Sequence, residues 1–102
     1  MSQASIAEQA PGVLALTGVL DYRTAPALRE RGGRLIASVQ AEACVIDCAN
    51  VEKSSSVGLS LLLAFLRDAA AAGKTLSVRS VPQDMQEIAR VCELQDILPL
   101  ED

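Results

Sequence analysis

The segment VEKSSSVGLSLLLAFL, residues 51–66, constrains the fold most, because it joins three consecutive serines to a helix that is apolar on two sides. On a wheel of about 100° per residue, the apolar residues of this helix separate into two opposite stripes. The first stripe consists of Leu59, Leu62, Leu63, Leu66 and Ala70. We expect this stripe to pack on a sheet.

The second stripe consists of Val57, Leu61, Ala64 and Phe65, beside Ser60 and Asp68. An apolar patch rimmed by polar groups usually marks an interface when it is exposed. We therefore expect this stripe to face outwards and to bind a partner, with Val57, Leu61 and Phe65 as its apolar anchors. The alternative is that the first or third helix of the same chain covers it. The expected partner-binding residues are Ser55, Ser56, Val57, Ser60, Leu61, Ala64, Phe65 and Asp68.

Strand and helix patterns alternate along the whole chain. Strand patterns occupy residues 5–10, 13–20, 43–48 and 74–80, and helix patterns follow Thr24, Ser55 and Pro82. The order is therefore β-β-α-β-α-β-α. A Pro-Gly turn makes the first strand antiparallel, and strands joined through helices pair in parallel with right-handed crossovers. We predict an α/β fold in one domain, residues 1–102: a small mixed sheet of four strands with its helices mainly on one face.

Several local features give the helices their expected limits. Thr24 is placed to cap the first helix, with Pro26 in its first turn. Gly32 and Gly33 interrupt this helix, and they indicate either close packing of the helix on the sheet or a break. In the third helix we expect one apolar stripe, made of Met85, Ile88, Ala89 and Cys92. Leu94, Ile97, Leu98 and Leu100 close the chain.

Composition excludes several classes of function. The net charge of -4 and the aromatic content of 2% disfavour binding to nucleic acids, which need cations and stacking rings. An arginine cluster that includes Glu30 is interpreted as a solvated helix face; it contains Arg23, Arg29, Arg31 and Arg34. The chain has no histidine, which excludes a Cys–His nucleophile and argues against a zinc site. We expect no catalytic residue, no metal and no cofactor.

The three cysteines, Cys44, Cys48 and Cys92, are expected to be structural, because their odd number argues against a disulfide framework. The densest apolar run, residues 59–66, is far shorter than the roughly 20 residues that cross a bilayer. The N-terminus shows no signal peptide pattern. We expect a soluble cytoplasmic protein that reaches a membrane only through a partner.

Ser54, Ser55 and Ser56 stand at the start of the two-sided helix. A serine there caps the helix, and the same position receives a phosphoryl group well because of the helix dipole and its free N–H groups. Capping is the simpler interpretation, and phosphorylation at one of these serines stays open. Catalysis by them is disfavoured, since the chain has neither a histidine base nor a G-x-S-x-G motif.

Nearly the whole chain resembles the STAS domain family, which includes anti-sigma factor antagonists and the tails of sulfate transporters. The resemblance rests on residues 14–28, residues 44–76 and the helix from Pro82. The first segment is similar to the family strand that ends in G-x-L-D, here Gly18, Leu20 and Asp21, and the second to the strand that ends in Asp47 before the switch loop.

The switch loop departs from that of the antagonists, which commonly reads D-S-S-G-L with the second serine phosphorylated. Alignment on Gly58 and Leu59 places Ser55 at the aspartate, Ser56 at the first serine and Val57 at the phosphorylated serine. The usual phosphoacceptor is therefore replaced by valine.

Within the family, the chain is most similar to the MlaB-like STAS subunits of Mla phospholipid ABC transporters, on Ser56, the aliphatic run after Gly58-Leu59, and Leu98-Pro99. The resemblance implies a non-enzymatic subunit that binds the cytoplasmic, MlaF-like ATPase and supports its assembly and activity. It would then lie in the cytoplasm, peripheral to the inner membrane, and contact the permease only indirectly. The alternative is an anti-sigma factor antagonist that acts by partner switching through serine phosphorylation.

Overall fold

The computed structural model describes residues 4–93 and 100–101. Its elements, in chain order, are β1 (Ser5–Ala10), β2 (Val13–Leu20), α1 (Ala25–Ser38), β3 (Ala43–Ser54), α2 (Ser56–Ala71), β4 (Thr75–Arg79), α3 (Gln83–Val91) and β5 (Leu100–Glu101). The predicted order of seven elements is confirmed, and the two-residue β5 is added to it. Of the closing residues named above, Leu94, Ile97, Leu98 and Pro99 lie outside the described residues.

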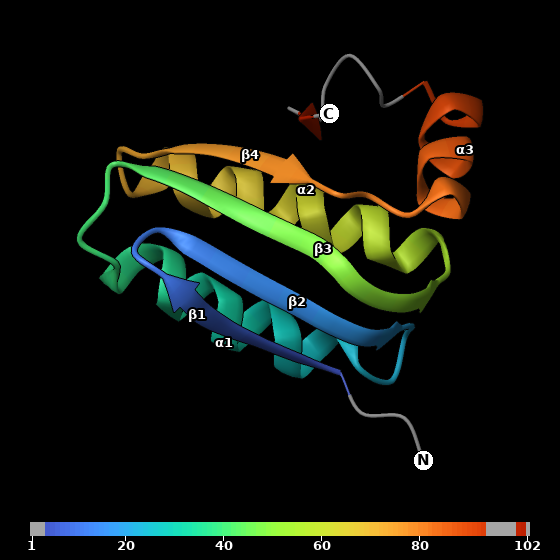
Figure 1. Cartoon of the computed structure of the whole chain (residues 1–102), viewed down its shortest axis with the longest axis horizontal. Helices are drawn as coiled ribbons and strands as arrows, with labels where there is room; N and C mark the ends of the chain where they lie inside the picture. Colours follow the sequence, from blue (N-terminus) through green and yellow to red (C-terminus); the bar gives the residue numbers. More distant parts are fainter. Residues whose placement is uncertain (1–3, 94–99, 102) are drawn as a thin grey trace.

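The sheet has the order β1-β2-β3-β4-β5. β1 pairs antiparallel with β2, and every other neighbouring pair is parallel, as predicted. Figure 1 shows α1 and α2 side by side on one face of the sheet, with α1 behind β1 and β2 and α2 behind β3 and β4. α3 lies at the end of the sheet where α2 begins. Among the residues that the structure describes, helices therefore cover one face of the sheet and leave the other face open.

The alternation of residues in β2 explains which face is covered. Leu14, Leu16 and Leu20 are at most 1% exposed, while the residues between them are only half-buried. Successive side chains of a strand point to opposite faces, so the leucines meet the helices and the other residues line the open face.

β3 is longer than predicted, since it extends from Ala43 to Ser54 and does not end at Cys48. The polar residues after Cys48 look like a loop in the sequence, but they pair with the second half of β2, through Thr17↔Asn50 and Leu20↔Ser54. This pairing contains two register shifts, and Val51 and Ser54 in its second half are buried. The predicted strand boundary was wrong because backbone pairing, which the side-chain pattern does not show, continues for six residues.

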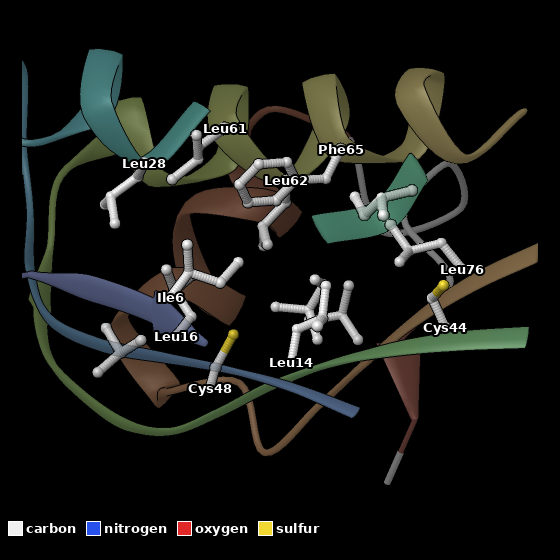
Figure 2. Close-up of a cluster of buried hydrophobic side chains, with 14 of the residues drawn as sticks. Ile6, Leu14, Leu16, Leu28, Cys44, Cys48, Leu61, Leu62, Phe65 and Leu76 are labelled. Atoms are coloured by element: carbon white, nitrogen blue, oxygen red, sulfur yellow. The ribbon is translucent and has the colours of Figure 1, made fainter. Parts of the chain in front are cut away.

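The second apolar stripe of α2 is covered, and the prediction that it faces outwards was wrong. Leu61, Ala64 and Phe65 are 3%, 6% and 0% exposed. Figure 2 shows Leu61 and Phe65 in one cluster with Leu62, beside Leu28 of α1. The alternative, that the first helix covers this stripe, is the one that the structure shows, because α1 and α2 pack along their lengths.

The first stripe was also only partly right. Leu59 and Leu62 are buried, Leu63 and Leu66 are partly buried, and Ala70 is exposed. The buried arc of α2 is therefore shared between sheet and α1 and lies between the two predicted stripes. It consists of Gly58, Leu59, Leu61, Leu62, Ala64, Phe65 and Ala69.

Gly32 explains why α1 approaches α2 so closely. A Cβ at this position would lie 2.5 Å from Cζ of Phe65, far inside van der Waals contact. The helix does not break at Gly32 and Gly33, since α1 is continuous from Ala25 to Ser38. Close packing is therefore the correct interpretation of Gly32, but the expected partner was wrong: the sheet was predicted, and the closest neighbour is Phe65 of the other helix.

The cysteines divide into two buried residues and one exposed residue, and none forms a disulfide. Cys44 and Cys48 point into the core from β3 (Figure 2). Cys92 follows the end of α3 and is exposed, so its predicted place in the buried stripe of that helix was wrong; Met85 and Ala89 are buried and Ile88 is partly buried.

We expect native alkylation to modify Cys92 alone. Burial raises the pKa of the Cys48 thiol to about 12, with a smaller contribution from the Asp47 charge, and burial also raises that of Cys44. Only the thiolate reacts, so both should stay unmodified. Iodoacetamide at pH 8 followed by intact-mass analysis should add one label to the native protein and three in urea. Rapid addition of three labels without denaturant would contradict the packing of β3.

Candidate docking surface at the start of the two long helices

The loops before α1 and α2 lie side by side, because they follow the adjacent parallel strands β2 and β3. The Ser55 backbone N–H donates to the Leu20 carbonyl at 3.1 Å, which joins the end of β2 to the serine loop. Both helices therefore begin at the same end of the molecule.

The three serines have three different environments. Ser54 is 8% exposed, and its hydroxyl donates to the Ser55 carbonyl at 2.8 Å. Ser55 is the N-cap of α2: its Oγ accepts from the Val57 N–H at 3.2 Å and donates to the Leu20 carbonyl at 3.4 Å. Ser56, the first residue of α2, is exposed, and its hydroxyl has no partner among the described residues. Of the three hydroxyls, that of Ser56 is the one open to a partner or a kinase.

The loop between β2 and α1 is held by Asp21 and Thr24. Asp21 Oδ1 accepts from the Arg23 N–H at 2.9 Å and from the Thr24 N–H at 3.2 Å. These bonds, led by that from Arg23, lower the pKa of Asp21 from its ordinary value. Thr24 stands at the N-cap position without capping the helix, contrary to prediction, because its hydroxyl instead donates to the Val19 carbonyl at 2.9 Å. The loop is thereby braced, and it presents Tyr22 with 76% of its surface exposed.

A groove of about 390 Å³ runs between the first halves of α1 and α2. Its lining residues are Tyr22, Ala25, Pro26, Arg29, Val57, Ser60, Leu61 and Ala64. Leu61 and Ala64 form its buried floor, Val57 is half-buried, and Ser60 is exposed at its edge. The lining is apolar apart from Arg29, Ser60 and the Tyr22 hydroxyl, so the groove suits apolar side chains.

An ion pair between Arg29 of α1 and Asp68 of α2 bridges the two helices beside the groove. The side chains are 45% and 25% exposed, so solvent weakens this pair. Asp68, one of the residues predicted to contact a partner, is thus already engaged within the chain.

The structure brings together only some of the predicted residues. Val57, Ser60, Leu61 and Ala64 line the groove, and Ser55 and Ser56 precede them on the same loop. Phe65 does not belong to the surface, since it is fully buried beneath α1. Sequence reasoning missed the α1 side of the groove, which is formed by Tyr22, Ala25, Pro26 and Arg29. The available signal was the parallel pairing of two consecutive strand–helix units, which places both helix starts together.

A family model described as "Mlab, STAS domain" matches residues 4–99. No curated protein sequence matches the chain.

Three solved structures illustrate the similarity. An anti-sigma factor antagonist from Mycobacterium paratuberculosis is 27% identical, with a TM-score of 0.78 over 98% of this chain and 85% of that chain. A chain of the ATP-bound Acinetobacter MlaFEDB complex is 23% identical, with a TM-score of 0.82 over 95% of this chain and 99% of that chain. An anti-sigma-factor antagonist (STAS) domain protein from Planctomyces limnophilus is 15% identical, with a TM-score of 0.73 over 100% of this chain and 91% of that chain.

Proposed function

Because this chain belongs to the STAS domain family, in the group described as Mlab, we propose that it is a non-enzymatic adaptor subunit of an Mla-type phospholipid ABC transporter. In this role it binds the cytoplasmic ATPase subunit and supports its assembly and activity. The family description favours this role, and the similar chain in the Acinetobacter MlaFEDB complex has nearly the same extent.

The main support for this proposal comes from the serine loop. Val57 stands where antagonists of this family have their phosphorylated serine, and it lies half-buried at the groove. Ser54 is buried, and the Ser55 hydroxyl is bonded as the cap of α2. An apolar residue at the acceptor position favours a permanent contact with the partner over a contact that reversible phosphorylation breaks.

We propose that the partner contacts Ser55, Ser56, Val57 and Ser60 and reaches the groove floor at Leu61 and Ala64. Phe65 supports that floor from beneath without touching the partner. Asp68 acts through its ion pair with Arg29, which joins the two helices beside the groove. The chain acts as a single domain over residues 1–102, without a cofactor.

The partner supplies the link to the inner membrane. Within the described ranges 4–93 and 100–101, no helix has both the length and the apolar character needed to cross a bilayer. We propose that the protein lies on the cytoplasmic side and meets the permease only through the ATPase.

Co-expression with the ATPase subunit tests this function. We expect the two proteins to co-purify as a complex, and the ATPase to be more soluble and more active with this chain than without it. Val57→Asp should weaken the complex at least tenfold, because it buries a charge in the contact, while its thermal unfolding stays close to that of the wild type. An ATPase that neither binds the wild-type chain nor changes its activity would refute the proposal.

The alternative, an anti-sigma factor antagonist, is favoured by the 27% identity with the Mycobacterium protein. Ser56 would then be the phosphorylated residue, since its hydroxyl is exposed at the start of α2. Incubation with the cognate anti-sigma kinase and ATP, followed by mass spectrometry, distinguishes the two functions. Phosphate on Ser56, lost in Ser56→Ala, would support the antagonist; binding to the ATPase without phosphorylation would support the adaptor.

A further inference from the structure

We propose that the groove between α1 and α2, together with the arginines beside it, binds an acidic segment of the ATPase whose apolar side chains enter the groove next to Tyr22. This inference rests on the proposed function and adds to it the chemistry of the contact. Its two supports, an open apolar groove and a net positive charge on the segment that contains α1 and α2, are independent of each other.

The apolar support centres on Tyr22. Only two large apolar side chains are exposed in the described part of the chain, Tyr22 at 76% and Val91 at 83%. Tyr22 adjoins a formed groove, whereas Val91 lies at the end of α3. Leu61 and Ala64 at the groove floor are already desolvated, so the apolar area that an inserted side chain buries lies mainly on Tyr22, Pro26 and Val57. Tyrosine beside a preformed pocket is typical of interface residues that dominate binding energy.

The charge support comes from the distribution of arginines. The segment from Asp21 through α1, taken with α2, contains five arginines against three acidic residues, a net charge of +2 in a chain whose total is -4. The remainder of the protein therefore carries -6. An acidic partner is attracted to the helical layer and repelled elsewhere, which orients its approach.

The arginines can exchange their present partners. Arg23 pairs with Asp21 and Arg34 pairs with Glu30, and these two arginine side chains are 74% and 77% exposed. Exposed ion pairs of this kind are weak, so a carboxylate of the partner can compete for the guanidinium groups. Arg31 is different, because its Nε donates to the Ile6 carbonyl at 2.8 Å and ties α1 to β1. Arg23, next to Tyr22 in the chain, is the arginine best placed to meet an acidic partner at the groove.

The test measures the affinity of the full chain for the purified ATPase subunit at 50 mM and 300 mM NaCl. Tyr22→Ser should weaken binding at least tenfold at both salt concentrations, while its matched control, Val91→Ser, should stay within twofold of the wild type. Arg23→Gln should weaken binding about three- to tenfold at 50 mM and much less at 300 mM, since salt screens the exposed charge. Its control, Arg90→Gln on α3, should bind as the wild type does. Thermal unfolding of each variant identifies any loss due to misfolding.

The outcomes separate the inference from the function on which it rests. Tight binding by both Tyr22→Ser and Arg23→Gln would overturn the inference and leave the adaptor function intact. A wild-type chain that does not bind the ATPase would overturn both. Vesicles containing 30% phosphatidylglycerol test a membrane as the alternative partner. If the vesicles bind the wild type but not Arg23→Gln, and if this substitution leaves ATPase binding unchanged, the basic surface binds a membrane. The inference is then wrong.

Discussion

Phe65→Ala is expected to lower the free energy of unfolding by about 3–5 kcal/mol, the range for removing a buried phenylalanine. The Phe65 side chain is 0% exposed and lies between α1 and the core of the sheet, so its removal leaves a cavity that the helices can fill only by moving. Urea unfolding followed by far-UV circular dichroism measures the loss. Leu66→Ala, at the neighbouring and partly buried position, serves as the control and should cost distinctly less.

This prediction also separates two views of α2. If Phe65 were a surface anchor, as the two-stripe pattern suggested, its replacement would impair binding and leave stability almost unchanged. A loss below about 1 kcal/mol would therefore contradict the buried packing and restore the surface role. The structure further implies that a charged residue at position 61 or 65 unfolds the domain, so such variants cannot be used to test docking.

Gly32→Ala is expected to destabilise the protein by about 1–3 kcal/mol, as overpacked core substitutions do. Alanine favours a helix over glycine by about 1 kcal/mol, so the steric cost must exceed this gain. The new methyl group would overlap the Phe65 ring, which is confined on all sides. Chemical denaturation of Gly32→Ala, of Phe65→Leu and of the variant that combines them measures the energetic coupling between the two positions.

Two further variants test the origin of this loss. Gly33→Ala is the matched control. Its Cβ would meet the ends of two partly exposed side chains, Asp68 Oδ2 at 3.0 Å and Arg29 Nη1 at 3.7 Å, so the stability should change by less than about 1 kcal/mol. In the Phe65→Leu background, Gly32→Ala should cost much less, because the ring is absent. Equal losses in both backgrounds would show that Gly32 is not in contact with Phe65.

Most of the fold was predictable because its signals are local. The alternation of leucines in β2 indicates a strand with one buried face, and β2 has the predicted bounds, Val13–Leu20. The serines and Gly73 mark the two ends of α2, where Ser55 caps the helix and Gly73 has a φ of +71°. At the ends of α2 the residue type itself indicates the backbone conformation, because serine favours the N-cap position and glycine favours a positive φ.

The wrong predictions concern features of the fold that tertiary contacts determine. The end of β3 depends on pairing with β2, which the polar residues after Cys48 do not reveal. Phe65 is covered because α1 approaches α2 at Gly32, whereas the sequence interpretation had that glycine pack on the sheet. The serine side of the groove was predictable from the helix start, but the opposite side, with Tyr22 and Pro26, requires the positions of two loops that lie more than thirty residues apart.

The most direct test of the account is amide hydrogen exchange of this chain with and without the ATPase subunit. We propose that docking occurs at the end of the molecule where α1 and α2 begin. Binding should therefore slow exchange in residues 20–26 and 55–61 and leave the edge strand β1 and the end of α2 unchanged. Protection confined to β1 or to the open sheet face, with residues 55–61 exchanging as in the free protein, would contradict it.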